Sequence, residues 1–256
     1  MKTDLAGKVA IVTGSSQGIG RAIALKLAES GADVVINGRH PEAGQEVVSQ
    51  VRALGRRCTF HQADICDYAQ VKGMVDQTVR EWGRLDIMVG CGGPGYPPAQ
   101  LFHETDPQAY LEYFRNRLFP RLYAIRAALE PMKEGGQGKI VLISTDAGRV
   151  PTPGESLIGA AAAGLVLMTK ALAREFSRWK VHINTICITV TIDTPGFERA
   201  RKGGMGKIFE RAAQRMPFWP LKPDDIAEMA LFLASPESDR ITGQIISING
   251  GLAFPG

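Results

Sequence analysis

The sequence of 256 residues predicts the α/β class: a single doubly wound domain, with a parallel sheet of about seven strands and helices on both faces. Two observations predict it. Nearly all-apolar runs alternate with helical patterns along the chain, and strands buried on both faces of a parallel sheet have this apolar character. No linker, repeat or low-complexity stretch interrupts the pattern, so residues 1–256 are expected to form one domain.

The expected strands are short apolar runs rich in β-branched residues. They are 8–14, 33–38, 58–65, 85–90, 138–145, 181–188 and 244–250. Helical patterns lie between them, the clearest being 18–31, 41–55, 154–175 and 223–235. Gly31 ends the first of these helices, and Pro41 stands near the start of the second. The one irregular insertion spans about 190–220, before the last helix.

Composition excludes several classes of protein. Hydrophobic residues make up 45% and charged residues 22%, as in an ordinary soluble globular protein. The sequence has no uninterrupted apolar run of about 18 residues, and it begins with the charged segment MKTDLAGK, so a cytoplasmic protein without a membrane partner is expected. A net charge of +4 is too small to indicate a nucleic-acid partner. The cysteines lack metal-site spacing, so buried thiols and no metal are expected at Cys58, Cys66, Cys91 and Cys187.

The segment TGSSQGIG, residues 13–20, joins the first expected strand to the first expected helix. In a dinucleotide-binding turn, Gly14 would make the tight turn, Gly18 would let the backbone approach a pyrophosphate, and Gly20 would allow close helix packing. The start of the helix would supply free N–H groups and partial positive charge. The context of strand, turn and helix therefore predicts dinucleotide binding.

The end of the second expected strand indicates which dinucleotide. An acidic residue there suits the ribose 2′-hydroxyl of NAD, whereas an arginine suits the 2′-phosphate of NADP. The sequence has Asn37, Gly38 and Arg39, with no carboxylate before Glu42. NADP(H) is therefore favoured over NAD(H). The alternative is that Arg39 is a solvated loop residue.

Over essentially its whole length the sequence resembles the classical short-chain dehydrogenase/reductase family. TGSSQGIG resembles the family's TGxxxGIG motif, AGLVLMTKALARE the second half of its catalytic helix, and ITGQIISINGG its C-terminal strand. The resemblance implies a Rossmann-like fold, an NAD(P)-dependent oxidoreductase and a homodimer or homotetramer that acts on a small-molecule substrate. The cofactor contacts it implies are Gly14, Ser16, Gln17, Gly18, Ile19, Gly20, Arg39, Asp64, Ile65 and Gly92.

The family's chemistry normally uses a tyrosine and a lysine, at YxxxK spacing, on the helix after the fifth strand. Aligned with the family, this sequence has Ile158 and Ala162 at those places, and no tyrosine follows Tyr123. Its one YxxxK, Tyr68 to Lys72, falls on the helix after the third strand, which is expected to face away from the ligand crevice. The resemblance therefore implies a divergent member without the usual proton relay.

Two further family positions also differ. The serine that ends the fifth strand corresponds to Thr145, which keeps a hydroxyl. The asparagine expected after the fourth strand falls at Arg117 or, one residue away, at Asn116, and both alternatives stay open. The family's Asn-Asn-Ala-Gly after the fourth strand is here Gly-Cys-Gly-Gly, residues 90–93. All these departures cluster where the nicotinamide and the substrate would meet.

Other side chains near the expected crevice could take over catalysis. The candidates are Thr145, Asp146, Tyr96 and Glu155. Each also has a structural alternative, as a solvated loop residue or a helix cap. The insertion at about 190–220 resembles the family's substrate lid, and residues 197–216 carry a surplus of four positive charges. These charges either attract an anionic substrate or form the solvated face of two amphipathic helices.

Two hypotheses follow for the function. The first is an NADP(H)-dependent oxidoreductase with a non-standard active site, which reduces an activated C=C or C=O bond in a partly apolar, anionic substrate. The second is a protein of the same fold without net redox chemistry: a catalytically silent nucleotide-binding partner, or a lyase or isomerase. Only the resemblance and the fold favour the first.

Overall fold

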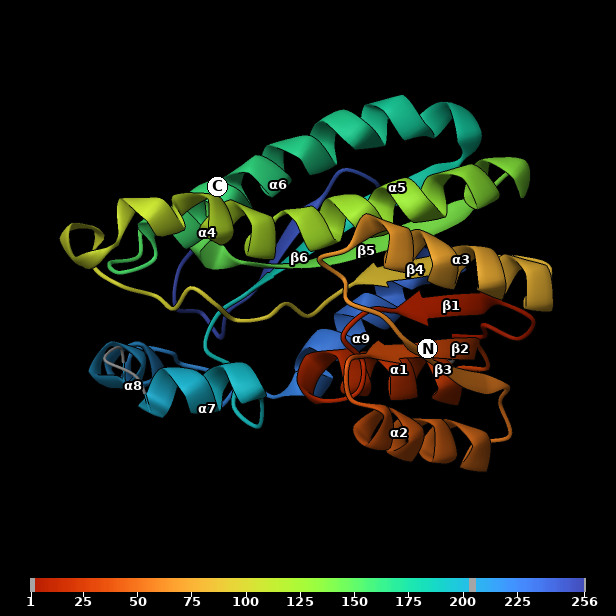
Figure 1. Cartoon of the computed structure of the whole chain (residues 1–256), viewed down its shortest axis with the longest axis horizontal. Coiled ribbons are helices and arrows are strands. Elements are labelled where there is room, and N and C mark those ends of the chain that lie inside the picture. Colours follow the sequence, from red (N-terminus) through yellow and green to blue (C-terminus); the bar gives the residue numbers. More distant parts are fainter. Residues whose placement is uncertain (1–2, 203–205, 256) are drawn as a thin grey trace.

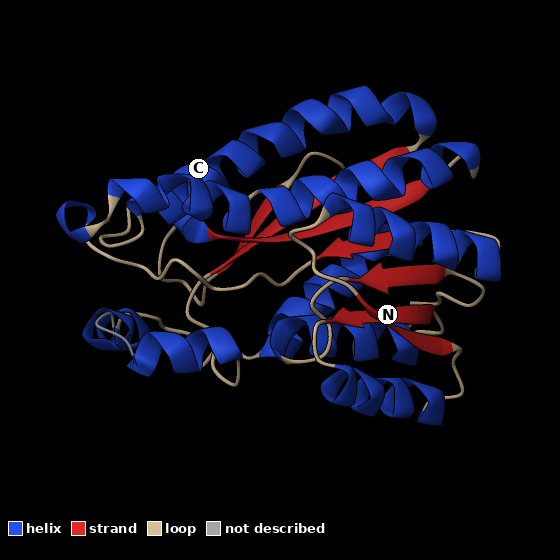
Figure 2. Ribbon diagram, viewed as in Figure 1, coloured by secondary structure: helices blue, strands red, loops and turns tan. Residues whose placement is uncertain are grey.

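The computed structural model describes residues 3–202 and 206–255, and it contains one parallel sheet between two layers of helices (Figures 1 and 2). The strand order is β3-β2-β1-β4-β5-β6-β7, and every adjacent pair is parallel. The strands are β1 Val9–Val12, β2 Asp33–Gly38, β3 Cys58–Gln62, β4 Ile87–Gly90, β5 Gly138–Thr145, β6 Val181–Ile188 and β7 Ile245–Ile248. The predicted α/β doubly wound fold is confirmed.

Each face of the sheet has its own apolar core, as expected for strands that are buried on both sides. Helices α1, α2 and α9 pack on one face, and α3, α5 and α6 on the other (Figure 1). The helices are α1 Gly18–Glu29, α2 Pro41–Ala53, α3 Tyr68–Trp82, α4 Tyr110–Arg117, α5 Phe119–Glu134, α6 Ser156–Phe176, α7 Pro195–Lys202, α8 Gly206–Gln214 and α9 Pro223–Ala234. Short 3₁₀ turns lie between them, among them η3 at Asp146–Gly148.

Strands β2, β5 and β6 have the predicted bounds, whereas β1, β3, β4 and β7 are shorter than predicted. The difference lies mostly at the strand ends, where the chain leaves the sheet to build turns. Thr13, for example, uses its hydroxyl to donate to the Cys91 carbonyl at 2.7 Å and to accept from the Cys91 N–H at 2.8 Å. This pair ties the carboxyl ends of β1 and β4 together.

The strand order reverses between β1 and β4, because the chain first runs outward through β2 and β3 and then returns beside β1. In open α/β sheets, ligands bind outside the carboxyl ends of the strands at such a switch point. The residues predicted to bind the cofactor lie on the turns that follow β1, β2, β3 and β4. The fold thus places them around one crevice.

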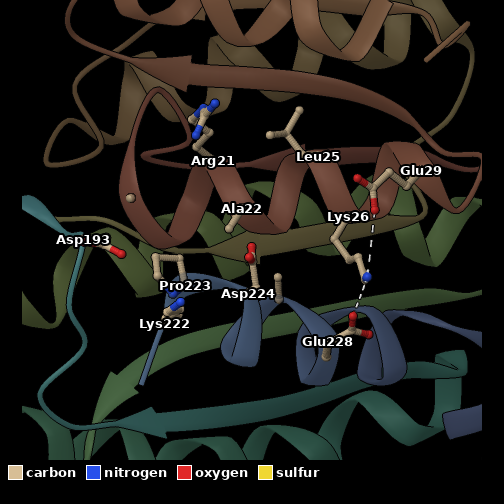
Figure 3. Close-up of a pocket in the computed structure, with 12 residues that line it drawn as sticks. Arg21, Ala22, Leu25, Lys26, Glu29, Asp193, Lys222, Pro223, Asp224 and Glu228 are labelled. Atoms are coloured by element: carbon tan, nitrogen blue, oxygen red, sulfur yellow. Dashed lines mark ion pairs between the residues drawn. The ribbon is translucent and has the colours of Figure 1, made fainter. Parts of the chain in front are cut away.

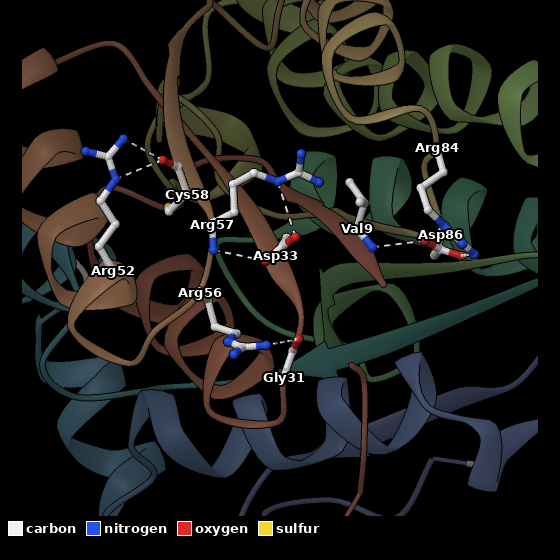
Figure 4. Close-up of polar contacts among 9 residues, drawn as sticks. All are labelled: Val9, Gly31, Asp33, Arg52, Arg56, Arg57, Cys58, Arg84 and Asp86. Carbon is white, nitrogen blue, oxygen red and sulfur yellow. Dashed lines mark hydrogen bonds and ion pairs between the residues drawn. The ribbon is translucent and has the colours of Figure 1, made fainter. Parts of the chain in front are cut away.

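The opposite, amino ends of the strands are fixed by charged contacts (Figure 4). Asp86 accepts from the Val9 N–H at 2.9 Å and from Arg84 at 2.6 and 2.8 Å, so β4 is joined to the start of β1. Asp33 accepts from the Arg57 N–H at 2.9 Å, which joins β2 to the start of β3. These contacts hold the sheet together at the end that faces away from the crevice.

Helix α6 is the one described helix that is both long and apolar enough to cross a membrane. By length and composition alone, Ser156–Trp179 could cross a membrane, with a mean hydropathy of 1.7 over its most apolar window. However, Leu165, Ala173 and Phe176 lie in the core under the sheet, and the core helix of a soluble protein passes the same test. The composition of α6 is therefore only weak evidence for a membrane span.

Candidate active site

The turn from β1 to α1 has the backbone that its glycines predict. Gly14 and Gly18 have φ angles of +59° and +55°, in the left-handed region that favours glycine. A Cβ on Gly20 would overlap the Gly14 carbonyl, so the helix passes as close to the turn as predicted. Gln17, at the N-cap, makes no side-chain cap, which leaves the first N–H groups of α1 free for an anion.

Asn37 holds this turn in place, a role that the sequence did not reveal. It is fully buried at the end of β2, and its Oδ1 accepts from the Gly14 N–H at 3.1 Å. Its Nδ2 donates to the carbonyls of His61 and Ala63 at 3.2 and 3.1 Å. A buried polar residue flanked by apolar ones in β2 was the available signal, because such a group must find hydrogen-bond partners.

Arg39 follows β2 directly and is exposed. Its carbonyl accepts from Gln62 Nε2 at 3.1 Å, and its side chain makes no hydrogen bond in the described part of the chain. Ser16 lies close to the end of β2, since a Cβ on Gly38 would come within 2.8 Å of the Ser16 Oγ. Across the crevice, a Cβ on Gly92 would lie 3.6 Å from Ile65 Cδ1. Asp64 accepts from the Cys66 N–H at 2.9 Å.

The two candidates at the end of β5 differ in how their side chains are used. Thr145 Oγ1 accepts from the Ala147 N–H at 3.2 Å, and its own proton has no acceptor among the described residues. The Asp146 carboxylate is 6% exposed and accepts from Ser247 Oγ at 2.5 Å and from Asn249 Nδ2 at 2.8 Å. Thr145 can therefore donate to a ligand, whereas both oxygens of Asp146 are engaged by the end of β7.

Ile158 and Ala162 lie on one face of α6, one turn apart, and are 8% and 6% exposed. Their helix packs very closely on η3: a Cβ on Gly148 would come within 2.8 Å of the Ala162 Cβ, and one on Gly159 within 2.5 Å of the Ala147 carbonyl. The start of α6 thus presents an apolar surface beside the end of β5. Tyr68 and Lys72 are on α3, where Lys72 forms an ion pair with Asp76.

Asn116 and Arg117, the two alternatives for the family's asparagine, both lie in the last turn of α4, before α5 begins at Phe119. Asn116 Nδ2 donates to the Tyr96 carbonyl at 2.9 Å and to Glu112 Oε2 at 3.1 Å, so its amide is committed to the loop and its own helix. Arg117 Nη2 donates to the Pro97 carbonyl at 2.9 Å. Burial lowers the pKa of Arg117.

Glu155 precedes α6 and is half-buried, and its side chain makes no cap hydrogen bond in the described part of the chain. Its helix-capping alternative is therefore not realised. Burial raises the pKa of the Glu155 carboxyl, and the positive charge of Arg117 opposes that rise. The loop before it is tied to the loop after β4, because the Gln100 N–H donates to the Gly154 carbonyl at 2.8 Å. A half-buried carboxyl near a half-buried guanidinium thus lies between these two loops.

Tyr96, the remaining candidate, is 59% exposed and its hydroxyl makes no hydrogen bond with the described residues. Arg121 is a half-buried cation near the end of β5 that the sequence did not indicate. Its Nε and Nη2 donate to the Ile143 carbonyl of β5 at 3.1 and 3.0 Å, and burial lowers its pKa. Its spacing from Arg117, four residues along the helical pattern, was the only signal available in the sequence.

Comparison with known proteins agrees with this architecture. A family model described as enoyl-(acyl carrier protein) reductase matches residues 14–253, nearly the whole chain. The chain belongs to the short-chain dehydrogenase/reductase family. Cyclohexanol dehydrogenase from Rhodococcus sp. (strain TK6) is 34% identical over 272 residues, covering 98% of this chain and 97% of the relative. A 3-oxoacyl-(acyl-carrier-protein) reductase from Thermotoga maritima is 30% identical, covering 98% and 99%.

Solved structures of this family are similarly close. A dehydrogenase/reductase from Sinorhizobium meliloti 1021 superposes with a TM-score of 0.89 at 32% identity, covering 99% of this chain and 98% of the other. A 7α-hydroxysteroid dehydrogenase in complex with NADH and 7-oxoglycochenodeoxycholic acid has a TM-score of 0.89 at 25% identity, covering 98% and 96%. This short-chain dehydrogenase/reductase is thus an oxidoreductase by family, and its homologues bind NAD(P)(H).

The predicted lid of this short-chain dehydrogenase/reductase forms helices α7 and α8, and residues 203–205 lie outside the described residues. Thr194 caps α7, accepting from the Phe197 N–H at 3.1 Å. A Cβ on Gly18 would come within 3.2 Å of Pro195 Cδ, so α7 starts directly against the glycine turn between β1 and α1. Arg199, farther along α7, packs on Gly95 of the loop after β4.

A separate groove of about 490 Å³ lies between α1 and α9 (Figure 3). Charged side chains line it, and an ion pair between Lys26 and Glu228 crosses its floor. None of the four catalytic candidates lines this groove. Its one link to the cofactor half of the short-chain dehydrogenase/reductase is Gly18, at the start of α1. The size of the groove therefore does not make it the reaction site.

Proposed function

We propose that the protein is an NADP(H)-dependent oxidoreductase that reduces an activated C=C or C=O bond, with Glu155 as the proton donor in place of the family's tyrosine. One observation carries the proposal: Glu155 is a half-buried carboxyl at the start of α6, close to the positive charge of Arg117, and desolvation raises its pKa. A general acid works best when its pKa lies near the working pH, and burial moves a carboxyl in that direction.

The residues around the crevice fit a bound dinucleotide. Gly14, Gly18 and Gly20 leave a cradle that a Cβ would fill, and the first N–H groups of α1 are not capped by Gln17. Among the described residues the Arg39 side chain makes no hydrogen bond or ion pair, and it directly follows Gly38, beside which Ser16 Oγ lies, so these two side chains could share a 2′-phosphate. This arrangement supports NADP(H) over NAD(H).

When bound, the reduced nicotinamide supplies a hydride. Thr145 would keep its proton and donate a hydrogen bond from its hydroxyl to the substrate's carbonyl oxygen, which polarises the bond to be reduced. Glu155 would deliver the proton that balances the reaction, to that oxygen or to the neighbouring carbon. Ile158 and Ala162, which we place at the family's tyrosine and lysine positions, would keep the reacting carbon away from water. An already polarised bond needs less acid assistance, which fits a site without the usual relay.

We also propose that the protein is a cytoplasmic homodimer or homotetramer. Helix α6 exposes Ala160, Ala163 and Leu167, the last at 69%, and α4 exposes Leu111 at 82%. A small-residue stripe beside large exposed apolar side chains suits close helix packing against a second subunit. Light scattering on the purified protein checks this: a monomer at micromolar concentration would contradict it.

The first experiment titrates NADPH and NADH into the protein and follows nicotinamide fluorescence. NADPH is expected to bind more tightly. Enones, enoyl thioesters and ketones are then screened for oxidation of NADPH. Binding without turnover on any of them would instead support a silent nucleotide-binding protein or a lyase or isomerase, and would sink the redox proposal.

With an active substrate in hand, Glu155→Gln tests the proton donor. Its kcat is expected to fall about 10²-fold to 10⁴-fold, the usual contribution of a positioned general acid, while the Kd for NADPH stays unchanged. Glu46→Gln is the matched control, since Glu46 is an exposed carboxyl on α2, away from the crevice. An unchanged kcat in Glu155→Gln would remove Glu155 from the mechanism.

A further inference from the structure

Two guanidinium groups from different parts of the fold meet over the loop that follows β4. Arg117, in the last turn of α4, donates from Nη2 to the Pro97 carbonyl at 2.9 Å. Arg199, on the lid helix α7, packs on Gly95 so closely that a Cβ there would lie 2.6 Å from its Nη2. The lid and α4 therefore bring two positive charges to the same short stretch of chain.

Among the described residues, few negative groups or hydrogen-bond acceptors lie close enough to balance these two positive charges. Arg117 Nε is sealed from solvent without a hydrogen-bond partner, and Nη1 makes no hydrogen bond either. Arg199 forms no ion pair in the described part of the chain, whereas Arg201, on the same helix, pairs with Glu198 at 2.9 Å. Arg199 and Arg121 both lower the pKa of Arg117, which shows that the three cations lie near one another.

Among the described carboxylates, only that of Glu155 raises the pKa of Arg117. Desolvation of Glu155 itself favours the neutral form of its carboxyl. A structural ion pair would instead hold Glu155 in direct contact with Arg117, yet no hydrogen bond joins them in the described structure. Burying a cation beside another cation is unfavourable unless an anion joins them. The fold has therefore brought Arg117 and Arg199 together while Arg117 Nε and the charge of Arg199 have no partner among the described residues.

We propose that Arg117 and Arg199 bind an oxyanion of the substrate, a carboxylate or a phosphate, at the mouth of the crevice. The inference rests on the proposed function, because it assigns a substrate class to the same crevice. Guanidinium groups bind carboxylates and phosphates through paired N–H donors, and Arg117 Nη1 together with Arg199 supplies such donors from two sides. The lid would close on the charged end of the substrate and leave the reducible bond beside Glu155.

The binding test needs no turnover. Benzoate and phenyl phosphate serve as probes and benzamide as their neutral match, and binding is measured by calorimetry. The wild-type protein is expected to bind at least one of the two anions more tightly than benzamide, and the preferred anion identifies the substrate's charged group. Equal binding of all three probes would overturn the proposal.

Variants then locate the site. Arg199→Gln and Arg117→Gln are each expected to weaken binding of the preferred anion about 10-fold to 100-fold, the usual effect of losing a charge-assisted hydrogen bond. Arg201→Gln is the matched control, because it removes the same charge from the same lid helix but lies in an ion pair with Glu198. Arg199 is exposed, so its variant keeps the test valid even if Arg117→Gln does not fold. Equal losses in Arg199→Gln and Arg201→Gln would reduce the effect to general charge attraction and refute a specific site.

Proton uptake gives a second readout. Arg117 lowers the pKa of Glu155, so an anion on Arg117 should weaken that effect and make Glu155 take up a proton. Calorimetry in buffers of different ionisation enthalpy should detect uptake near the pKa of Glu155, and Glu155→Gln should abolish it without abolishing binding. Anion binding without uptake at any pH would contradict the placement beside Glu155. Failure of NADPH to bind, with anion binding intact, would refute the proposed function alone.

Discussion

Asp146 accepts a hydrogen bond from Asn249 Nδ2 at 2.8 Å, and this contact joins the end of β5 to the segment after β7. A second one, from Ser247 Oγ, occupies the other carboxylate oxygen. An acid at the mouth of the crevice is a natural catalytic candidate, but here both carboxylate oxygens already accept hydrogen bonds from the end of β7. The contact indicates that Asp146 fixes the wall of the crevice.

Asp146→Ala is therefore expected to lower the free energy of unfolding by about 2 kcal/mol, because two buried donors lose their acceptor. The Kd for NADPH should change little. Urea unfolding and cofactor titration check both quantities. If stability were unchanged while kcat fell steeply, Asp146 would belong to the catalytic groups instead.

Arg39→Ala tests the choice of cofactor. Removing a charged donor from a 2′-phosphate should raise the Kd for NADPH about 10-fold to 100-fold, whereas the Kd for NADH should stay the same. Arg80→Ala is a suitable control, since Arg80 is exposed on α3. An equal rise in Kd for both dinucleotides would show that Arg39 supports the fold and does not bind the 2′-phosphate.

The raised pKa of Glu155 predicts how stability depends on pH. The folded protein holds this proton at pH values where the unfolded chain has lost it, so its contribution to stability is present below the ordinary carboxyl pKa. That contribution is lost as pH rises through the folded pKa. Relative to the wild type, Glu155→Gln should therefore gain in Tm as pH rises above the ordinary carboxyl pKa of 4.5 and through the folded pKa. A Tm difference that does not vary with pH would show that Glu155 is not held neutral in the fold.

Ile158→Tyr combined with Ala162→Lys tests whether the start of α6 is the family site with its two reactive side chains replaced. The larger side chains should lower stability by about 1–3 kcal/mol, because this surface is already buried. If the rest of the relay is in place, ketone reduction should rise about 10²-fold or more over the wild type. Each single variant serves as a control, since neither supplies the pair. No gain, in a variant that still folds and binds NADPH, would contradict the assignment of these positions.

Much of the fold was predictable because hydrophobic periodicity reports burial, and burial on both faces defines a parallel sheet. The glycine turn was predictable for a related reason: only glycine allows the backbone of Gly14 and Gly18 at φ near +60°. Strand ends were less predictable. The apolar pattern continues beyond the sheet at Thr13 and at Ala63, where the chain turns to build the crevice.

The catalytic half could be predicted only as a set of candidates. Sequence places Thr145, Asp146 and Glu155 near one another but does not show which oxygens are already bonded. That depends on Ser247, about 100 residues later, and on Arg117 from another helix. Likewise, the choice between Asn116 and Arg117 depends on which way the last turn of α4 faces, since the amide of Asn116 is used by Tyr96 and Glu112.

The contact between Gly14 and Gly92 links the two halves of the crevice. A Cβ on Gly14 would lie 2.8 Å from the Gly92 Cα, and Gly92 itself has a φ of +82°. The alanine expected at this place in the family would thus be strained here and would press on the nucleotide turn. Reverting the crevice to the family's chemistry is therefore a backbone problem as well as a side-chain one. Directed evolution that starts from the Ile158→Tyr, Ala162→Lys variant should therefore accumulate its further changes in residues 90–93 and in the turn at Gly14 that faces them.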